Sequence, residues 1–440
     1  MSVKGAFTVS LCAGRIGRGG GQDPMETSSS RDVVIVGGGV TGATLALALA
    51  QAGLAVVLID AQPMSAVLTP HFDGRASAIA AASMNQWRVL GLAEQLEAVA
   101  QPIRSILVTD GGAPGAAGRG IDAGVLRFDS EDLGDGPDAA LGFMVENRHI
   151  RAVVGQALTA AKVEIVAPAE VQALVVDAQA AQVRLADGRV FTAPLVVGAE
   201  GRRSGVREAA GIKTYGWSYG QTGVVATVQL AEPHNGVAHE YFLPGGPLAI
   251  LPLTGQRASL VWTEKTALAQ ALVAGSAPAF EAYLARRFGD HLGAPRLLGS
   301  RFAFPLDLQL AEQIVAPRTA LIGDAAHAIH PIAGQGLNLG LKDVAALAQV
   351  IVEARRLGED WGSELVLQRY ARWRRFDVAA VAAAADLFTR LFSNDIPVLR
   401  TVRGAGLALV NRMAPARRLF VREAAGVVGD RPRLLMGERL

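Results

Sequence analysis

Short runs of consecutive apolar residues, separated by glycines, mark the first part of this chain. Val33 to Val36 is such a run and predicts a buried parallel strand, because a strand covered on both faces lacks alternating polar positions. The Ala- and Leu-rich stretch from Ala43 to Gln51 favours a helix. Gly53 separates this helix from a second predicted strand over Ala55 to Ile59. The order of elements indicates the start of an α/β fold.

Three glycines follow the first strand with the spacing G-x-G-x-x-G, at Gly37, Gly39 and Gly42. The first allows a tight turn, the second lets the backbone approach a pyrophosphate, and the third permits close helix–strand packing. Asp60 has the spacing of an acid that binds an adenosine ribose hydroxyl. The uncharged stretch from Val33 to Ile59 is also long enough for a membrane span, but its glycine cluster and flanking acids favour the nucleotide site. This segment predicts a dinucleotide site that holds FAD or NAD.

A second strand-and-helix segment selects between the two dinucleotides. Ala320 to Ile322 end a predicted strand, and Asp324 then stands where it can accept a ribityl hydroxyl of a flavin. The following residues predict a loop and a helix that begins near Leu337, whose N–H groups would stabilise negative charge on the flavin's pyrimidine edge. An ordinary strand–loop–helix with a capping asparagine is the alternative. We therefore expect FAD.

These segments, with VVGAEGRRSGVR from Val196 to Arg207 between them, resemble the single-component flavin aromatic hydroxylases. That family's pattern GDAAH-x-x-x-P-x-x-G-Q-G-x-N is matched by Gly323, Asp324, Ala325, Ala326, His327, Pro331, Gly334, Gln335, Gly336 and Asn338. In the middle segment the family usually has Gly-Ala-Asp-Gly, whereas this chain has Glu200 before Gly201. Glu200 either assists the pyrophosphate loop and the nicotinamide approach or caps the following turn.

The resemblance implies that the flavin performs the chemistry, so no side chain is assigned as a catalytic acid or base. Pro331, Gly334 and Gln335 would flank the flavin ring. The implied cofactor-binding residues are Gly37, Gly39, Gly42, Asp60, Arg75, Asn147, Arg148, Glu200, Gly201, Gly323, Asp324, Gly334, Gly336, Leu337 and Asn338. His71, His234 and His239 are candidates by residue type only, and core or surface roles are expected for them.

Two further segments resemble the ubiquinone-biosynthesis hydroxylases: DGRASAIAAASMNQWRVLGLAEQL from Asp73 and HEYFLPGGPLAILPLTGQRASLVWT from His239. The resemblance implies hydroxylation of the aromatic ring of a polyprenylphenol, with NADH or NADPH as reductant and O2 as oxidant, through a hydroperoxide at flavin C4a. A flavin hydroxylase of a soluble aromatic acid and a flavoprotein scaffold subunit of a ubiquinone-biosynthesis complex stay open. So do the ring carbon, the prenyl length and the choice of nicotinamide.

The remaining pattern completes the expected fold. Residues from about Ala76 to Gly136 begin as a helical piece and become loop-rich, whereas Tyr215 to Ala303 alternate as in an antiparallel sheet. The Asp187-Gly188 pair predicts a hairpin, and Phe143 to Leu158 a strand end and a helix.

The resemblance implies an α/β fold like that of p-hydroxybenzoate hydroxylase. It combines a Rossmann-like FAD-binding domain with an inserted mixed or antiparallel-sheet substrate domain and C-terminal helices. The predicted boundaries are 1–30 for a disordered tail or misplaced start, 31–75, 140–214 and 304–350 for FAD binding, 76–139 and 215–303 for substrate, and 351–440 for the C-terminal helices.

Composition and charge limit the expected compartment, the type of cofactor chemistry and the partners. The single cysteine, Cys12, excludes an intrachain disulfide and a multi-cysteine metal site, which favours a reducing, cytoplasmic compartment and flavin rather than metal chemistry. A net charge of +2 is too balanced to suggest nucleic acid. From Arg400 to Leu440, nine arginines and three acids are interleaved with Leu, Val and Phe. That pattern fits peripheral contact with the inner membrane or with other ubiquinone-biosynthesis proteins, or a solvated basic helix. The oligomeric state stays open.

Overall fold

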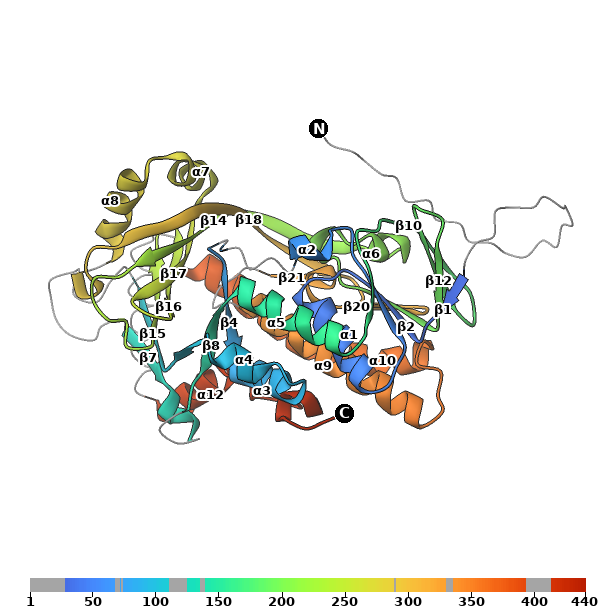
Figure 1. The fold of residues 1–440 in the computed structure, drawn as a ribbon. Helices are drawn as coiled ribbons and strands as arrows, with labels where there is room; N and C mark the ends of the chain where they lie inside the picture. The colour runs from blue at the N-terminus through green and yellow to red at the C-terminus, as the bar shows by residue number, and fades with distance from the viewer. Residues whose placement is uncertain are drawn as a thin grey trace, which may run out of the picture.

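A computed structural model describes residues 28–67, 72, 74–110, 125–134, 139–288, 290–329, 335–392 and 413–440. The residues outside these ranges include the tail up to residue 27 with Cys12, and also His71, Pro331 and Gly334. The described chain forms two large sheets, with the first helix and the C-terminal helices packed between and beneath them (Figure 1).

The first sheet has the strand order β19-β20-β13-β2-β3-β9 and is parallel except at β19. Its strands are β2 (Val33–Val36), β3 (Val56–Ile59), β9 (Glu164–Val166), β13 (Leu195–Gly198), β19 (Val315–Ala316) and β20 (Thr319–Leu321). Alternate residues of β2 and β3 enter two different cores, one beneath the helices and one beneath a second sheet. Both faces are therefore covered, which explains why these strands are apolar throughout.

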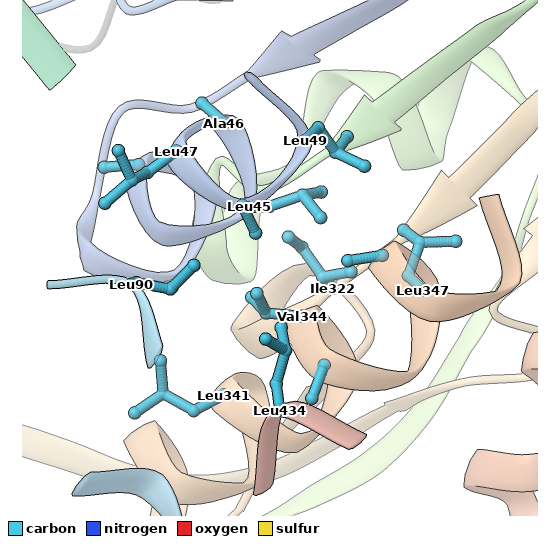
Figure 2. Packing of buried hydrophobic residues seen from close by; sticks show 14 of the residues in the cluster. Leu45, Ala46, Leu47, Leu49, Leu90, Ile322, Leu341, Val344, Leu347 and Leu434 are labelled. Atoms are coloured by element: carbon cyan, nitrogen blue, oxygen red, sulfur yellow. The ribbon is translucent and has the colours of Figure 1, made fainter. Parts of the chain in front are cut away.

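Helices α1 (Val40–Gln51), α5 (Asn147–Ala160) and α9 (Gln335–Arg356) cover one face of this sheet. Figure 2 shows Leu45 of α1 on the side that faces Val344 of α9, with Leu434 of η6 (Arg433–Met436) in the same cluster. The uncharged Val33 to Ile59 stretch is thus strand, helix and strand. No helix in the described ranges is long and apolar enough to span a membrane.

The other face carries a small sheet with the order β1-β12-β11-β10. Its strands are β1 (Ser28–Ser30), β10 (Val171–Val176), β11 (Ala181–Leu185) and β12 (Val190–Ala193). The turn between β11 and β12 contains Gly188 with φ +88°, which confirms the predicted hairpin. α6 (Gly205–Ala209) follows this layer, and α2 (Met64–Val67) follows β3.

The second large sheet has the order β21-β18-β14-β17-β16-β15-β6-β7. Its strands are β6 (Ser105–Asp110), β7 (Val125–Asp129), β14 (Thr214–Gln229), β15 (Val237–Leu243), β16 (Gly246–Leu253), β17 (Arg257–Lys265), β18 (Arg296–Ala311) and β21 (His327–Ala328). Pairing is antiparallel except between β15 and β6, so the predicted mixed sheet is confirmed. The long strands β14 and β18 run from this lobe to the first sheet (Figure 1).

The antiparallel pairing expected between Tyr215 and Ala303 is confirmed, but this segment also contains helices, and the expectation for Ala76–Ala80 was wrong. Between Tyr215 and Ala303 lie not only strands but also α7 (Thr266–Ala274) and α8 (Ala277–Phe288), which bury Leu272 and Phe280 against the sheet. In addition, Ala76–Ala80 is the strand β4 rather than a helix. It becomes a strand because its backbone pairs with β8 (Gly142–Glu146), a partner about 65 residues away that the local pattern does not show.

The other elements connect these layers. β4, β8 and β5 (Gln101–Ile103) form a three-stranded sheet, and α3 (Ala81–Val89) and α4 (Ala93–Glu97) follow β4. The C-terminal part consists of α10 (Glu364–Phe392) and α12 (Ala414–Ala424). Single turns complete the described elements: η1 (Ser130–Leu133), η2 (Gly201–Arg203), η3 (Asp290–Leu292) and η4 (Gly323–Ala325).

Candidate active site

Strand order brings the three motif segments to one edge of the first sheet. β20, β13 and β2 are neighbours and run parallel, with Leu321 paired to Gly198 and Gly198 paired to Val36. Each motif follows directly after one of these strand ends. Since carboxyl ends of parallel strands share an edge, the three loops meet there, beside the point where the strand order reverses.

The glycine turn after β2 is held by close backbone contacts. A Cβ on Gly37, whose φ is +108°, would lie 2.4 Å from the carbonyl of Ala199, and one on Gly42 would lie 2.0 Å from the carbonyl oxygen of Gly37. These two glycines are therefore required by the protein's own packing.

Gly39 differs from both. Its φ of −62° and ψ of 173° suit any residue, and a Cβ built there would meet no atom within 4 Å. Neither conformation nor protein packing requires a glycine at this position. Gly39 is also the N-cap of α1, without a side-chain cap, and it lines a large cavity. A helix N-terminus with free N–H groups and no side chain in front of it suits a bound anion such as a pyrophosphate.

Asp60 supports this turn from the next strand. Its carboxylate accepts hydrogen bonds from Gly38 N at 2.5 Å and from Gln62 N at 2.7 Å. The residue stands at the end of β3, where the motif expects it. The predicted ribose contact stays a prediction.

In the middle segment, Glu200 contacts its own turn. Ser204 Oγ donates to one carboxylate oxygen at 2.5 Å, and Val206 N donates to the other at 3.1 Å. Burial raises the pKa of Glu200, and these two hydrogen bonds act against that rise. Glu200 thereby shapes η2, in which Gly201 lines the cavity with φ +79°. These contacts favour the capping alternative, and a direct cofactor contact by Glu200 stays a prediction.

Buried Arg207 joins the middle segment to the third one. It donates to the carbonyl of Ala325 at 3.0 Å and to the carbonyl of Arg202 at 2.8 Å. The side chain of Arg202 stays at the cavity, with guanidinium nitrogens 3.9 Å from both Asp307 and Asp324. Arg202 thus places a positive charge beside Asp324, the residue that is expected to contact the flavin.

Asp324 projects from η4 into the cavity with half of its side chain exposed. Partial burial raises the pKa of its carboxyl, whereas Arg202 and His327 lower it. Within the described ranges no hydrogen bond is made by this carboxylate, so it has acceptor capacity left for a ligand hydroxyl. The position agrees with the predicted ribityl contact, which remains a proposal.

A buried charge cluster beneath η4 was missed by the sequence-based reasoning. The carboxylate of Asp343, fully buried on α9, accepts from Gly323 N at 2.9 Å and from Arg374 Nε at 2.7 Å, and lies 2.6 Å from His327 Nε2. It therefore fixes the turn that carries Asp324. The sequence did contain a signal, because Asp343 interrupts an apolar helix face. It did not show that Arg374 on α10 is the partner of Asp343.

Of the predicted cofactor residues near the start of α5, one lines the cavity and two do not. Asn147 at the start of α5 lines the cavity and accepts from Ser77 Oγ at 2.7 Å. Arg148 lies instead 2.7 Å from Glu146, and Arg75 is exposed beside the cavity, with its carbonyl accepting from Asn147 N.

The side-chain amide of Asn338 pairs with the backbone of β4, as a neighbouring strand would. It donates to the carbonyl of Ala78 and accepts from Ala80 N, both at 2.8 Å, and so joins α9 to β4. Gln335, Gly336 and Leu337, in the first turn of α9, line the cavity. A Cβ on Gly336 would also meet no atom within 4 Å.

The cavity has a volume of about 1600 Å³. It begins at the motif loops and continues along one face of the second large sheet, with Val225, Leu251 and Val261 in its wall. It ends between α10 and α12, at Phe376 and Phe420. A pocket for a single small ligand measures roughly 300–1,000 Å³, so this larger volume has room for a dinucleotide and an elongated second molecule.

The donor set at the motif end fits FAD. Two helix N-termini, those of α1 and α9, face the cavity without side chains at Gly39 and Gly336. The carboxylate of Asp324 lines the same cavity and makes no hydrogen bond in the described ranges, so it matches a sugar-alcohol hydroxyl. Pyrophosphate, ribityl chain and pyrimidine edge each have a chemically matched partner.

Comparison with known proteins gives a consistent result. A family model described as FAD binding domain matches residues 30–385. The chain is 46% identical over 410 residues to the ubiquinone hydroxylase UbiL of Rhodospirillum rubrum, covering 92% of each chain. It is 37% identical to the 3-demethoxyubiquinol 3-hydroxylase of Escherichia coli, covering 91% of this chain and 100% of that one. Human COQ6, a mitochondrial ubiquinone biosynthesis monooxygenase, is 31% identical over 89% of this chain and 92% of its own.

Solved structures agree on the fold. The p-nitrophenol 4-monooxygenase PnpA of Pseudomonas putida superposes with a TM-score of 0.74 at 21% identity, covering 92% of this chain and 100% of that one. PqsL of Pseudomonas aeruginosa, in complex with 2-aminobenzoylacetate, gives a TM-score of 0.71 at 25% identity, covering 86% and 99%.

Proposed function

This chain belongs to the family of FAD-dependent hydroxylases of ubiquinone biosynthesis, and from that membership we propose that it hydroxylates the aromatic ring of a polyprenylphenol. NADH or NADPH supplies the electrons and O2 supplies the oxygen atom. The observation that carries the choice of substrate is the shape of the cavity: it is continuous from the cofactor motifs, along an apolar sheet face, to the C-terminal helices.

FAD, when bound, supplies the redox chemistry of this reaction. The protein's part is to orient cofactor and ring, to exclude water and to stabilise charge. The N-termini of α1 and α9 would present N–H groups to anionic parts of the cofactor, and Asp324 would accept a ribityl hydroxyl. Asp343 and Arg207 are not among the described lining residues of this cavity, and they hold the η2 and η4 turns in place.

The composition of the cavity wall separates the two candidate substrates. A soluble aromatic acid needs an arginine to pair with its carboxylate in the pocket. In the described part of the wall the one arginine is Arg202, which already lies near Asp307 and Asp324 at the cofactor end. The wall along the sheet is apolar at Ile106 and Leu251, as a prenyl chain requires. A polyprenylphenol therefore suits this cavity better than an acid.

The far end of the cavity suits a substrate that arrives from a membrane. Phe376 and Phe420 line the cavity and are 79% and 42% exposed, so they mark its mouth. Beside them Leu419 is 58% exposed, and Arg418 and Arg422 on the same helix are exposed. Apolar side chains flanked by arginines favour contact with an anionic bilayer. We infer that α12 rests on such a surface and that the prenyl chain enters there.

This contact predicts binding to vesicles that contain anionic lipid. The double variant Arg418→Glu and Arg422→Glu is expected to reduce affinity for phosphatidylglycerol-containing vesicles, measured by co-sedimentation, by at least about 30-fold, since each of the two lost cations contributes about 1 kcal/mol. Arg286→Glu with Arg296→Glu, exposed on α8 and β18, is the matched control and should bind like the parent. Equal binding of both double variants would exclude α12 as the membrane contact.

The enzyme function is tested by purification and by intermediate analysis. The purified protein is expected to be yellow and to release intact FAD on denaturation. With NAD(P)H and O2 it should convert a prenylated phenol into a product that is heavier by one oxygen atom. Cells that lack the protein should accumulate a ubiquinone precursor without one hydroxyl, which also identifies the ring carbon.

The alternatives predict other outcomes. Release of FMN would contradict the cofactor assignment, and turnover of a soluble aromatic acid alone would contradict the substrate. If a variant that binds no FAD restored ubiquinone in the deficient cells, the protein would be a scaffold rather than the hydroxylase.

A further inference from the structure

A single carboxyl stands in the apolar sheet wall of the cavity. It belongs to Glu240 on β15, whose neighbours on the same strand face, Ala238 and Phe242, also line the cavity. Across the strands, Glu240 is paired with Val108 of β6 and with Ala249 of β16, and both line the cavity. Every immediate neighbour on this face is thus apolar.

The opposite face of β15 shows that Glu240 does not belong to the core. His239 and Tyr241 alternate with it and turn toward α8 and η3, where Tyr241 Oη lies 3.3 Å from His291 Nε2. Glu240 points the other way, into the hollow, and is partly exposed there. In the described ranges its carboxyl makes no hydrogen bond and no ion pair.

The position of the Glu240 carboxyl in an apolar wall is energetically unfavourable. Transfer of a carboxyl into apolar surroundings without a hydrogen bond costs several kcal/mol, of the order of 2–7 for a polar group. Nothing in the described protein compensates for this cost. An apolar residue would suit the wall better, so the carboxyl serves a ligand.

We propose that Glu240 binds the phenol hydroxyl of the substrate and accepts its proton, which leaves the ring as an electron-rich phenolate for hydroxylation. This inference rests on the proposed function. In the proton transfer the phenol O–H bond breaks and an O–H bond forms on the carboxylate, with no change of oxidation state. NAD(P)H and O2, already required by the hydroxylation, supply the redox equivalents.

The protonation behaviour of the site is compatible with this role. Burial alone raises the pKa of Glu240 to about 8. A free phenol has a pKa of roughly 10, as tyrosine does, so the two groups are much closer in proton affinity than an ordinary glutamate and a phenol. The carboxyl is neutral below pH 8 and becomes a proton acceptor as the pH rises through that value.

No other ionisable residue is paired directly with Glu240 across the neighbouring strands, where its partners are Val108 and Ala249. Asp110 ends β6 beside Phe242, and His239 is neutral because burial and His291 lower its pKa to about 4. β16, on the other side, carries no ionisable residue. The remaining charged lining residues are Arg202 and Asp324 at the cofactor end and Asp377, Glu423 and Asp430 on the helical side. None of them contributes to the pKa shift of Glu240.

The test uses the full-length holoenzyme and 2-geranylphenol as the probe. Absorbance of the bound phenol is titrated against pH with oxidised enzyme, so this readout needs no turnover. With the parent, the phenol band should shift to longer wavelength with a midpoint near pH 8, because ionised Glu240 then draws the phenol proton into a strong hydrogen bond. With Glu240→Gln, which keeps the shape but cannot take the proton, the band should shift only near the pKa of the free phenol, roughly 10.

Turnover provides a second readout. Removal of a general base typically lowers the rate about 10²- to 10⁴-fold, so kcat of Glu240→Gln should fall by about 100-fold or more at pH 8. KM should change much less, and NAD(P)H oxidation should continue with peroxide as product. Glu240→Asp should recover part of kcat and the absorbance shift near pH 8. Glu312→Gln, the same change at an exposed residue, should match the parent.

The outcomes separate this inference from the proposed function. If Glu240→Gln keeps both the midpoint of the absorbance shift and kcat of the parent, the role of Glu240 is refuted while the hydroxylase stands. If the parent shows the Glu240-dependent absorbance shift of the bound phenol but forms no hydroxylated product, the proposed function fails and the role of Glu240 stands. If the parent does not bind the phenol at all, both are overturned.

Discussion

Replacement of Gly39 by leucine is expected to yield a folded protein that no longer retains FAD. The backbone at this position suits any residue, and a Cβ would meet no protein atom within 4 Å. The leucine side chain would instead occupy the cavity in front of the α1 N-terminus, where the pyrophosphate is expected. We expect FAD affinity to fall at least about 100-fold, equivalent to roughly 2.7 kcal/mol. Isothermal titration of the apoprotein with FAD measures this change.

The apoprotein itself should tolerate the substitution. Loss of a helix N-cap glycine costs about 1 kcal/mol or less, so urea unfolding without FAD should change little. Gly42→Ala is the contrasting variant, because its Cβ would lie 2.0 Å from the carbonyl oxygen of Gly37 and would distort the turn in either state. Gly39→Leu that binds FAD like the parent would show that the cofactor does not approach this helix end.

Replacement of Asp343 by alanine is expected to cost about 3–5 kcal/mol of folding free energy, the range for removal of one partner from a buried ion pair. The change leaves the Arg374 guanidinium buried without its main partner and deprives Gly323 N of its acceptor. The η4 turn that carries Asp324 should lose its position, so FAD retention should fall as well. Urea unfolding at pH 7 measures the stability change.

Asp377→Ala provides the matched control. Asp377 contacts the same guanidinium at 2.6 Å but is 34% exposed, so its removal should cost about 1 kcal/mol or less. Similar losses for both variants would contradict the assignment of Asp343 as the buried anchor.

The stability that Asp343 contributes should also depend on pH. Burial acts to raise the pKa of Asp343, but His327 and Arg374 outweigh it and hold the pKa below its usual range. A folded-state pKa below the unfolded value of roughly 4 means that the contribution is complete above that pH. It is lost as the pH falls through the folded pKa. The difference between parent and Asp343→Ala should therefore be constant near neutrality and shrink at strongly acidic pH.

The sequence by itself determined the local chemistry of the cofactor site. Val33 to Val36, the glycines that follow it and the helix after them are recognisable because each depends on near neighbours along the chain. The same holds for the hairpin at Gly188 and for the strand end before Asp324. Backbone preference and short-range packing act over a few residues, so these features could be predicted.

Only the tertiary structure decided how these pieces meet. The neighbouring order of β20, β13 and β2 collects the three motifs at one edge, and no local pattern contains that order. β4 is a strand because β8 and Asn338 satisfy its backbone groups from distant parts of the chain. Likewise, the alternation of side chains along β15 predicts that Glu240 and Tyr241 lie on opposite faces of the sheet. The sequence does not show which of these faces packs against a core and which one lines a cavity. That distinction arises when α8 packs on one face and leaves the other open, because burial is a property of all the layers together.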